Sequence, residues 1–394
     1  MPYQVEKNAF DPSSLGIYIH IPFCVRKCAY CDFYSLAAGQ DSMVQYHRAL
    51  MQMILQMGQK YRNRRVDTIY FGGGTPSCYP IEYLAEELDA IRTKFDLAAD
   101  CEITAECNPD SALRPWLQGA KRAGINRLSM GVQSADDEEL RRVGRLHNFE
   151  IAQTAFQTAR DAGFDNISLD LIYGLPNQTM ESWQHSVEAL LALKPDHLSC
   201  YGLKLEEGTP LFLHRQELTL VDDDGQADMY LWMVKRLEQA GLSQYEISNF
   251  ARPSRHSRHN LRYWLGQDYL GLGPAAHSYV DGVRSAIPRS LAEFCRGVED
   301  GKTQWELEGR IDEAERAREY VLLRLRTSWG ISILEAQQRF GIDCTSIEEE
   351  LRFFASYGWA EQTESRWHFT PEGYLRSNAL IGLLEERLEE QLAK

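Results

Sequence analysis

The chain is short of basic residues and lacks long apolar runs. Its 394 residues include 42 lysines and arginines against 57 aspartates and glutamates, a formal net charge of −15. Binding to nucleic acid needs a field of positive charge, so this balance argues against it. No stretch approaches the roughly 18 consecutive apolar residues of a membrane-spanning helix. Without such a helix, the sequence is compatible only with peripheral contact at the inner face of the membrane.

A secretory signal is also lacking, because residues 1–14 are polar and include Glu6, Lys7 and Asp11. We therefore expect a cytoplasmic protein. In that reducing compartment the nine cysteines are not expected to form a disulfide framework, and most should be buried thiols. A cluster among them would instead indicate a metal site.

Residues 16–205 alternate β-branched runs with helical patterns, which predicts βαβ units around a parallel sheet. Six strands are too few to close an eight-stranded barrel, so we expect an α/β fold with an open, partial (β/α)6 barrel. Its site should lie at the carboxyl ends of the strands. The expected strands are Ile17–Ile21, Val66–Phe71, Glu102–Glu106, Arg127–Gly131, Asn166–Leu171 and His197–Tyr201. The expected helices are Met43–Tyr61, Ile81–Phe95, Pro115–Ala123, Ile151–Ala162 and Glu181–Leu193.

Outside this core we expect an N-terminal arm (1–15), an irregular middle section (206–305) and a small C-terminal winged-helix-like α+β domain (306–394). Winged-helix domains often bind DNA through the helix before the wing. Here that helix carries three consecutive glutamates, Glu348–Glu350, and residues 310–394 hold 11 basic against 16 acidic residues. This argues against a DNA-binding regulator and favours a structural or protein-contact role.

The strongest pattern is Cys24-x3-Cys28-x2-Cys31, on a loop that Pro22 separates from the first strand. Three thiolates within eight residues can serve a single metal centre. A closed zinc site would need a fourth ligand at similar spacing, and the next cysteine is Cys78. Zinc completed by a distant histidine stays an alternative. On a [4Fe–4S] cluster, three ligands leave one iron open.

This spacing, with Tyr30 before the third cysteine, resembles the signature of the radical S-adenosylmethionine (SAM) superfamily. The resemblance implies a partial (β/α)6 barrel with a [4Fe–4S] cluster on the three cysteines. It also implies SAM bound to the open iron and cleaved by an electron from the cluster to give a 5′-deoxyadenosyl radical. The cofactors supply that chemistry, and the protein supplies position and redox tuning.

Further segments are similar to the HemN/HemW branch of the superfamily: Gly16–Cys24, Gly72–Pro76, Gly131–Ser134 and Asp170–Pro176. Each polar residue in them alone also fits an N-cap or an internal salt bridge, but their places at or just beyond successive strand ends favour one ligand. Besides Tyr30 near the cluster, the resemblance implies contacts to SAM from Tyr18, Gly73, Gly74, Thr75, Glu106, Gln133, Arg145 and Asp170.

Two marks narrow the resemblance within that branch. The oxygen-independent coproporphyrinogen III oxidases carry a further cysteine two residues after the third, where this chain has Phe33. Residues His259–Trp264 match the HNxxYW motif of HemW-like proteins. The implied function is a haem chaperone with haem, haem-acceptor proteins and an electron donor as partners. The alternative is the oxidase itself, and whether the chain forms a homodimer is open.

The surroundings of His259 are consistent with haem. Residues 252–262 hold four arginines and two histidines without an acid, a basic island that could neutralise two propionates. His259 could then ligate the iron while Tyr263 or Trp264 stacks on the macrocycle. The same residues also fit a solvated basic loop with an aromatic anchor.

Overall fold

The computed structural model describes residues 11, 13–37, 39–301 and 306–392. Most of the expected N-terminal arm, 1–15, lies outside the described residues. None of the described helices is both long and apolar enough to cross a bilayer. Of the six cysteines outside the triplet, four are buried, and Cys78 and Cys295 are half-buried.

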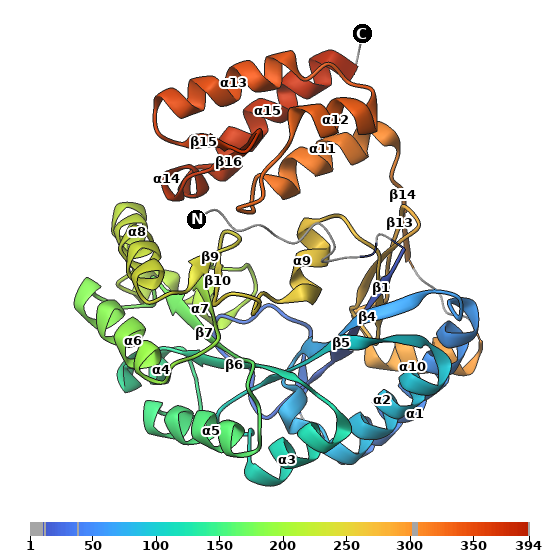
Figure 1. The fold of residues 1–394 in the computed structure, drawn as a ribbon. Coiled ribbons are helices and arrows are strands. Elements are labelled where there is room, and N and C mark those ends of the chain that lie inside the picture. The colour runs from blue at the N-terminus through green and yellow to red at the C-terminus, as the bar shows by residue number, and fades with distance from the viewer. Residues whose placement is uncertain (1–10, 12, 38, 302–305, 393–394) are drawn as a thin grey trace.

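The six predicted strands lie side by side and parallel at the centre of the sheet, which confirms the predicted partial barrel (Figure 1). Most residues of these strands are buried, and polar side chains such as Thr68, Thr104 and Ser129 are buried among the apolar ones. In chain and sheet order the strands are β1 (Leu15–Ile21), β4 (Arg65–Gly73), β5 (Asp96–Cys107), β6 (Arg127–Gln133), β7 (Ile167–Tyr173) and β8 (His197–Gly202). Outside them lie α1 (Gln40–Lys60), α2 (Ile81–Lys94), α3 (Arg114–Ala123), α4 (Asp137–Arg142), α5 (Phe149–Asp161) and α6 (Met180–Ala192).

The middle section is more regular than its sequence suggests, because it extends the sheet at both edges. Beyond β8 lie β10 (Asn249–Ala251) and β9 (Ser243–Gln244), both antiparallel additions. Beyond β1, β11 (Tyr269–Leu272) pairs in parallel. It is followed by β12 (His277–Val280), β13 (Val283–Ala286) and β14 (Glu306–Arg310). The helices of this section are α7 (Pro210–Leu213), α8 (Asp223–Gln239), α9 (Arg258–Trp264) and α10 (Leu291–Glu299).

The C-terminal domain consists of helices and a two-stranded hairpin, and it sits beside α9 (Figure 1). The segment Pro371–Leu392 forms two helices, because the backbone leaves the helical region at Arg376. A continuous set of buried apolar side chains runs from the barrel into this domain. Its elements are α11 (Glu313–Arg324), α12 (Ile333–Phe340), α13 (Thr345–Ser356), β15 (Ala360–Thr363), β16 (Arg366–Phe369), α14 (Pro371–Leu375) and α15 (Ser377–Leu392).

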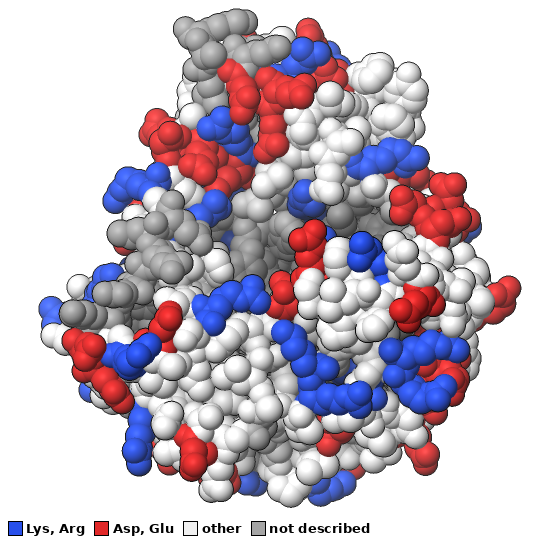
Figure 2. All heavy atoms as spheres, turned by 180° about the vertical axis from the view of Figure 1, so that it is seen from behind, with Lys and Arg blue, Asp and Glu red and all other residues white. Residues whose placement is uncertain are grey.

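Charges of both signs are mixed over this domain and over the surface. On α13, Glu348 pairs with Arg352 at 2.9 Å and Glu350 with Arg387 at 2.9 Å. Figure 2 shows Lys and Arg interspersed with Asp and Glu across the described residues of the face turned away from the view of Figure 1.

Candidate cofactor site

A cavity of about 580 Å³ lies at the carboxyl ends of the parallel strands, where the barrel fold was expected to place a site. It extends into the barrel as far as Asn260 of α9. The predicted residues that line it are Cys24, Cys28, Tyr30, Cys31, Gly73, Gly74, Thr75, Glu106, Gln133, Arg145 and Asp170. Four predicted residues lie elsewhere: Tyr18, His259, Tyr263 and Trp264.

The cysteine loop is fixed at the mouth of this cavity. Its strand β2 (Phe23–Cys24) pairs with β3 (Leu36–Ala37), and the amide of Ala29 donates to the carbonyl of Val143 at 3.0 Å. Burial raises the pKa values of the Cys24 and Cys31 thiols, so a positive centre is needed to hold them as thiolates. All three thiols are free of disulfides and half-buried.

The thiols also receive hydrogen bonds from the cavity wall. The Thr75 hydroxyl donates to Cys24 Sγ at 3.4 Å, and Arg145 Nη1 donates to Cys28 Sγ at 3.4 Å. Among the described residues, no three Cys, His, Asp or Glu side chains are grouped as ligands of a single ion. Single-ion zinc coordination needs such convergence, whereas the cysteines of a [4Fe–4S] cube each bind a different iron. Three half-buried thiols on one loop, none of them in a disulfide, are a donor set that fits the three cysteine ligands of a [4Fe–4S] cluster.

Glycines bring the backbone after β4 against the cysteine loop. The amide of Gly74 donates to the carbonyl of Ile21 at 2.9 Å, and that of Thr75 donates to Phe23 at 2.7 Å. A Cβ at position 74 would lie 2.6 Å from the Phe23 oxygen, and Gly73 has a φ of +106°. No larger side chain fits this close approach.

Glu106 stands at the end of β5 with one carboxylate oxygen toward each of two donors. The Tyr70 hydroxyl donates to Oε1 at 2.9 Å, and the Gly73 amide donates to Oε2 at 3.1 Å. Burial outweighs these bonds and raises the pKa of Glu106 to about 7. An arriving cationic group would restore the ionised form.

Gln133 and Arg145 face the cluster loop from β6 and the segment after α4. Gln133 has a φ of +73° at an irregularity in the β6 ladder, a strained conformation for a residue other than glycine. Arg145 Nη2 donates to Asn108 Oδ1 at 2.9 Å and to the Gly131 carbonyl. Asn108, which the sequence analysis did not select, also donates to Thr75 Oγ1 at 3.2 Å. Asn108 could have been selected from the sequence, because it is a polar residue directly after a strand.

Asp170 lies within β7 and faces the cavity, so it is a carboxylate inside the barrel. Hydroxyls donate to its Oδ1 from Ser129 at 3.2 Å and from Ser168 at 3.3 Å. Burial still raises the pKa of Asp170. Arg127, a second residue that the sequence analysis did not select, is 1% exposed, and its Nε lacks a hydrogen-bond partner among the described residues. The carboxylate of Asp170 and the Nε of Arg127 can therefore form hydrogen bonds with the hydroxyl or charged groups of a ligand.

Tyr18 lies behind the cavity wall. Its hydroxyl contacts His20 Nδ1 at 3.1 Å, and its ring stacks on Tyr70 at 6.2 Å between centroids. Tyr70 is the residue that holds Glu106. In this structure Tyr18 therefore supports the site rather than lining it.

The HNxxYW segment forms the floor of the barrel near the amino ends of β4 and β5. His259 is fully buried, with Nδ1 2.9 Å from the Thr68 hydroxyl and Nε2 2.9 Å from the Tyr263 hydroxyl. Since both ring nitrogens are engaged, this conformation does not fit haem ligation by His259. Trp264 lines a different pocket, next to the C-terminal domain.

The basic island is likewise engaged by the barrel. Arg262 is fully buried and pairs with Asp67, while Arg258 pairs with Asp100 at 3.3 Å. Arg255 lies 3.6 Å from an aspartate, and Arg252 donates to a backbone carbonyl at 3.0 Å. The island therefore attaches α9 and the loop before it to the sheet, and it does not form the propionate site that its composition suggests.

Comparison with known proteins gives matches along nearly the whole chain. Residues 18–190 match the radical SAM superfamily, and residues 311–376 match the HemN C-terminal domain. The heme chaperone HemW of Bacillus subtilis (strain 168) is 34% identical over 369 residues, covering 93% of this chain and 97% of that protein. HemW of Escherichia coli (strain K12) is 35% identical over 371 residues, covering 94% and 97%.

The solved structures extend the comparison to the fold. The chain resembles coproporphyrinogen III oxidase (HemN) of Escherichia coli, described as a radical SAM enzyme, with a TM-score of 0.83 and 24% identity. The match covers 95% of this chain and 91% of that one. The barrel and the C-terminal domain are thus both present in a protein of known structure.

Proposed function

Because this chain belongs to the HemW family of radical SAM proteins, we propose that it is a haem chaperone that binds haem and passes it to acceptor proteins. The proposal includes a [4Fe–4S] cluster on Cys24, Cys28 and Cys31, with SAM beside it. That cluster, when bound, supplies the electron for SAM cleavage. An electron donor is a further proposed partner, and the cytoplasm is the proposed location.

The polar groups around the cavity support a SAM site. Arg145 offers a guanidinium to the methionine carboxylate, and the backbone at Gly73 and Gly74 approaches closely enough for the ammonium. The ammonium would favour the ionised form of Glu106, whose pKa is raised by burial to about 7, and Asp170 offers oxygens to ribose hydroxyls. The buried, unpartnered Nε of Arg127 gives the cavity a further donor.

The presence of Phe33, where the oxidases have a further cysteine, is the observation that favours the chaperone over the oxidase. Phe33 lines the mouth of the cavity and is 68% exposed. A phenyl ring offers no thiol for redox or proton chemistry beside the cluster, but it offers an apolar surface.

The test uses anaerobically reconstituted protein with reductant and SAM, offered haem or coproporphyrinogen III. Stoichiometric haem binding in the Soret region, transfer to an apo-haem protein and no decarboxylated porphyrinogen are expected. Formation of protoporphyrinogen would establish the oxidase instead. A Cys24→Ala, Cys28→Ala, Cys31→Ala variant should lose cluster iron, sulfide and visible absorption while staying folded. Full retention of iron and sulfide would contradict the cluster assignment.

A further inference from the structure

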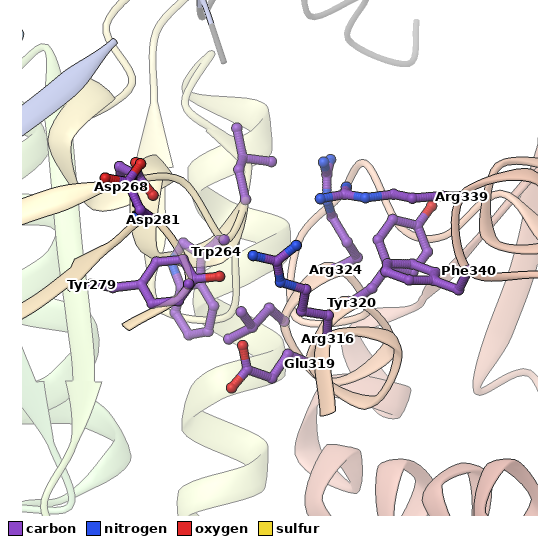
Figure 3. A pocket seen from close by; sticks show the side chains of 14 residues that line it. Trp264, Asp268, Tyr279, Asp281, Arg316, Glu319, Tyr320, Arg324, Arg339 and Phe340 are labelled. Atoms are coloured by element: carbon purple, nitrogen blue, oxygen red, sulfur yellow. Dashed lines mark hydrogen bonds between the residues drawn. The ribbon is translucent and has the colours of Figure 1, made fainter. Parts of the chain in front are cut away.

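A second pocket, of about 190 Å³, lies between the barrel and the C-terminal domain (Figure 3). Two aromatic side chains line it from the barrel side, Trp264 at the end of α9 and Tyr279 of β12. Two more line it from the C-terminal domain, Tyr320 of α11 and Phe340 of α12. Trp264 is the last residue of the HNxxYW motif, so the motif reaches this pocket.

Three arginines of the C-terminal domain, Arg316, Arg324 and Arg339, line the same pocket. Arg324 lies over the Tyr320 ring at 5.6 Å, and Arg339 lies over the Phe340 ring at 5.2 Å. The aromatic rings thus hold two of the guanidinium groups in place.

The acids of this pocket are already paired with other arginines. Glu319 pairs with Arg284, and Arg64 pairs with Asp268 at 2.8 Å and with Asp281 at 3.1 Å. Among the described residues, no carboxylate is in ion-pair contact with the three pocket arginines. Glu335 acts on Arg324, and Glu319 on Arg316, only from beyond ion-pair distance. The three arginines therefore lie beside the aromatic walls without a direct carboxylate partner among the described residues.

Partial burial makes the positive charges of Arg316 and Arg324 costly without an anion, whereas Arg339 is exposed at the edge of the pocket. The Nε of Arg316 is buried without a hydrogen-bond partner among the described residues, and Arg316 Nη2 packs close to Gly282 of the β12–β13 turn. Arg324 and Arg339 repel each other, and burial lowers the pKa of Arg324. A guanidinium group binds a carboxylate or phosphate through paired hydrogen bonds and thereby recovers this cost.

We propose that this interdomain pocket is an oxyanion site that takes a propionate carboxylate of haem. The inference rests on the proposed function and assigns a binding position to the haem that the chaperone carries. The pocket is large enough for a propionate arm but smaller than the 300–1,000 Å³ typical of sites that enclose a whole ligand. The edge of the macrocycle then lies against Trp264, because Trp264 lines the same pocket as the arginines.

The test measures haem affinity by Soret titration for wild type and for an Arg324→Gln, Arg339→Gln double variant. Haem dimethyl ester, whose propionates are uncharged, is titrated in parallel. Arg318→Gln is the matched control, because Arg318 lies on the same helix and pairs with Glu389 at 3.2 Å outside the pocket. Arg339→Gln alone, at an exposed position, serves if the double variant does not fold.

We expect at least a tenfold loss of haem affinity in the double variant and none in the control, with a similar loss when wild type binds the ester. Unchanged haem affinity in the double variant would overturn the inference and leave the proposed function standing. Inorganic phosphate is the third probe. If wild type bound no haem, while phosphate raised its melting temperature and not that of the variant, both the propionate assignment and the proposed function would fail, leaving a phosphate site.

Discussion

Buried carboxyl groups that line the cofactor cavity have raised pKa values, so their protonation depends on what binds beside them. Glu106 is the clearest case, because the pKa of its carboxyl is raised to about 7 at the edge of the cofactor cavity. In the unfolded chain the same group ionises near 4.5. Between these two values the folded protein binds more protons than the unfolded chain, so this group makes stability fall as pH rises.

We predict that Glu106→Gln, without cofactors, becomes more stable relative to wild type as pH rises from 5 to 7.5. The glutamine carries no charge that must be buried, and the gain should be about 1 to 3 kcal/mol. Urea denaturation at several pH values measures it. Affinity for SAM should fall in the same variant, since the carboxylate is absent. A stability difference that does not change with pH would contradict the raised pKa.

For His259 we predict a structural role. His259→Ala leaves the Thr68 and Tyr263 hydroxyls without their partner in a buried site, and should cost about 2 to 4 kcal/mol of unfolding free energy. The position of the Soret band of bound haem should stay unchanged. His259→Asn, which keeps part of the hydrogen bonding, should recover some stability. Loss of the Soret band at unchanged stability would instead make His259 the haem ligand.

At the scale of elements, the seven-residue helix α9 covers the end of the barrel near the amino ends of β4 and β5. It lies between β4 and the C-terminal helix α11 and is capped by the Ser257 side chain. Its arginines pair with acids near the starts of β4 and β5. The motif His259–Trp264 thereby connects the cofactor cavity on one side with the interdomain pocket on the other.

We predict that the two arginines of α9 differ sharply in their contribution to stability. Arg262→Ala leaves Asp67 unpaired in a buried site and should cost about 3 to 5 kcal/mol. Arg258→Ala removes a partly exposed ion pair and should cost under about 1 kcal/mol. Guanidinium denaturation of both variants checks this. Equal effects would mean that α9 is not held through Arg262.

On the scale of the whole molecule, residues from β2, β4, β5, β6, β7 and β8 contribute to one cavity, so a ligand there stabilises the entire barrel. We predict that SAM raises the melting temperature of the reconstituted protein by a few degrees. At 100 times the dissociation constant, linkage supplies about 2.7 kcal/mol. The triple cysteine variant should show little of this shift, because the open iron is lost. An equal shift in that variant would place SAM away from the cluster.

Local pattern alone was enough to predict the six parallel strands, five of the six helices between them and the cysteine loop. The short helix α4 was not predicted. Hydrophobic periodicity and turn residues depend on near neighbours in sequence, and the three cysteines lie within eight residues. The polar residues at strand ends were also predictable, because parallel strands end at the same edge of the sheet.

Only the tertiary structure decided which charges are paired. Arg262 meets Asp67 across 195 positions, and His259 meets Thr68 across 191, so no local pattern distinguishes an engaged basic island from a free one. The same long-range packing places Asn108 on Arg145, extends the sheet at both edges with the middle section, and gathers three arginines beside Trp264. The energy of an ion pair depends on the distance between the two charges in space, and this distance cannot be read from the order of residues along the chain.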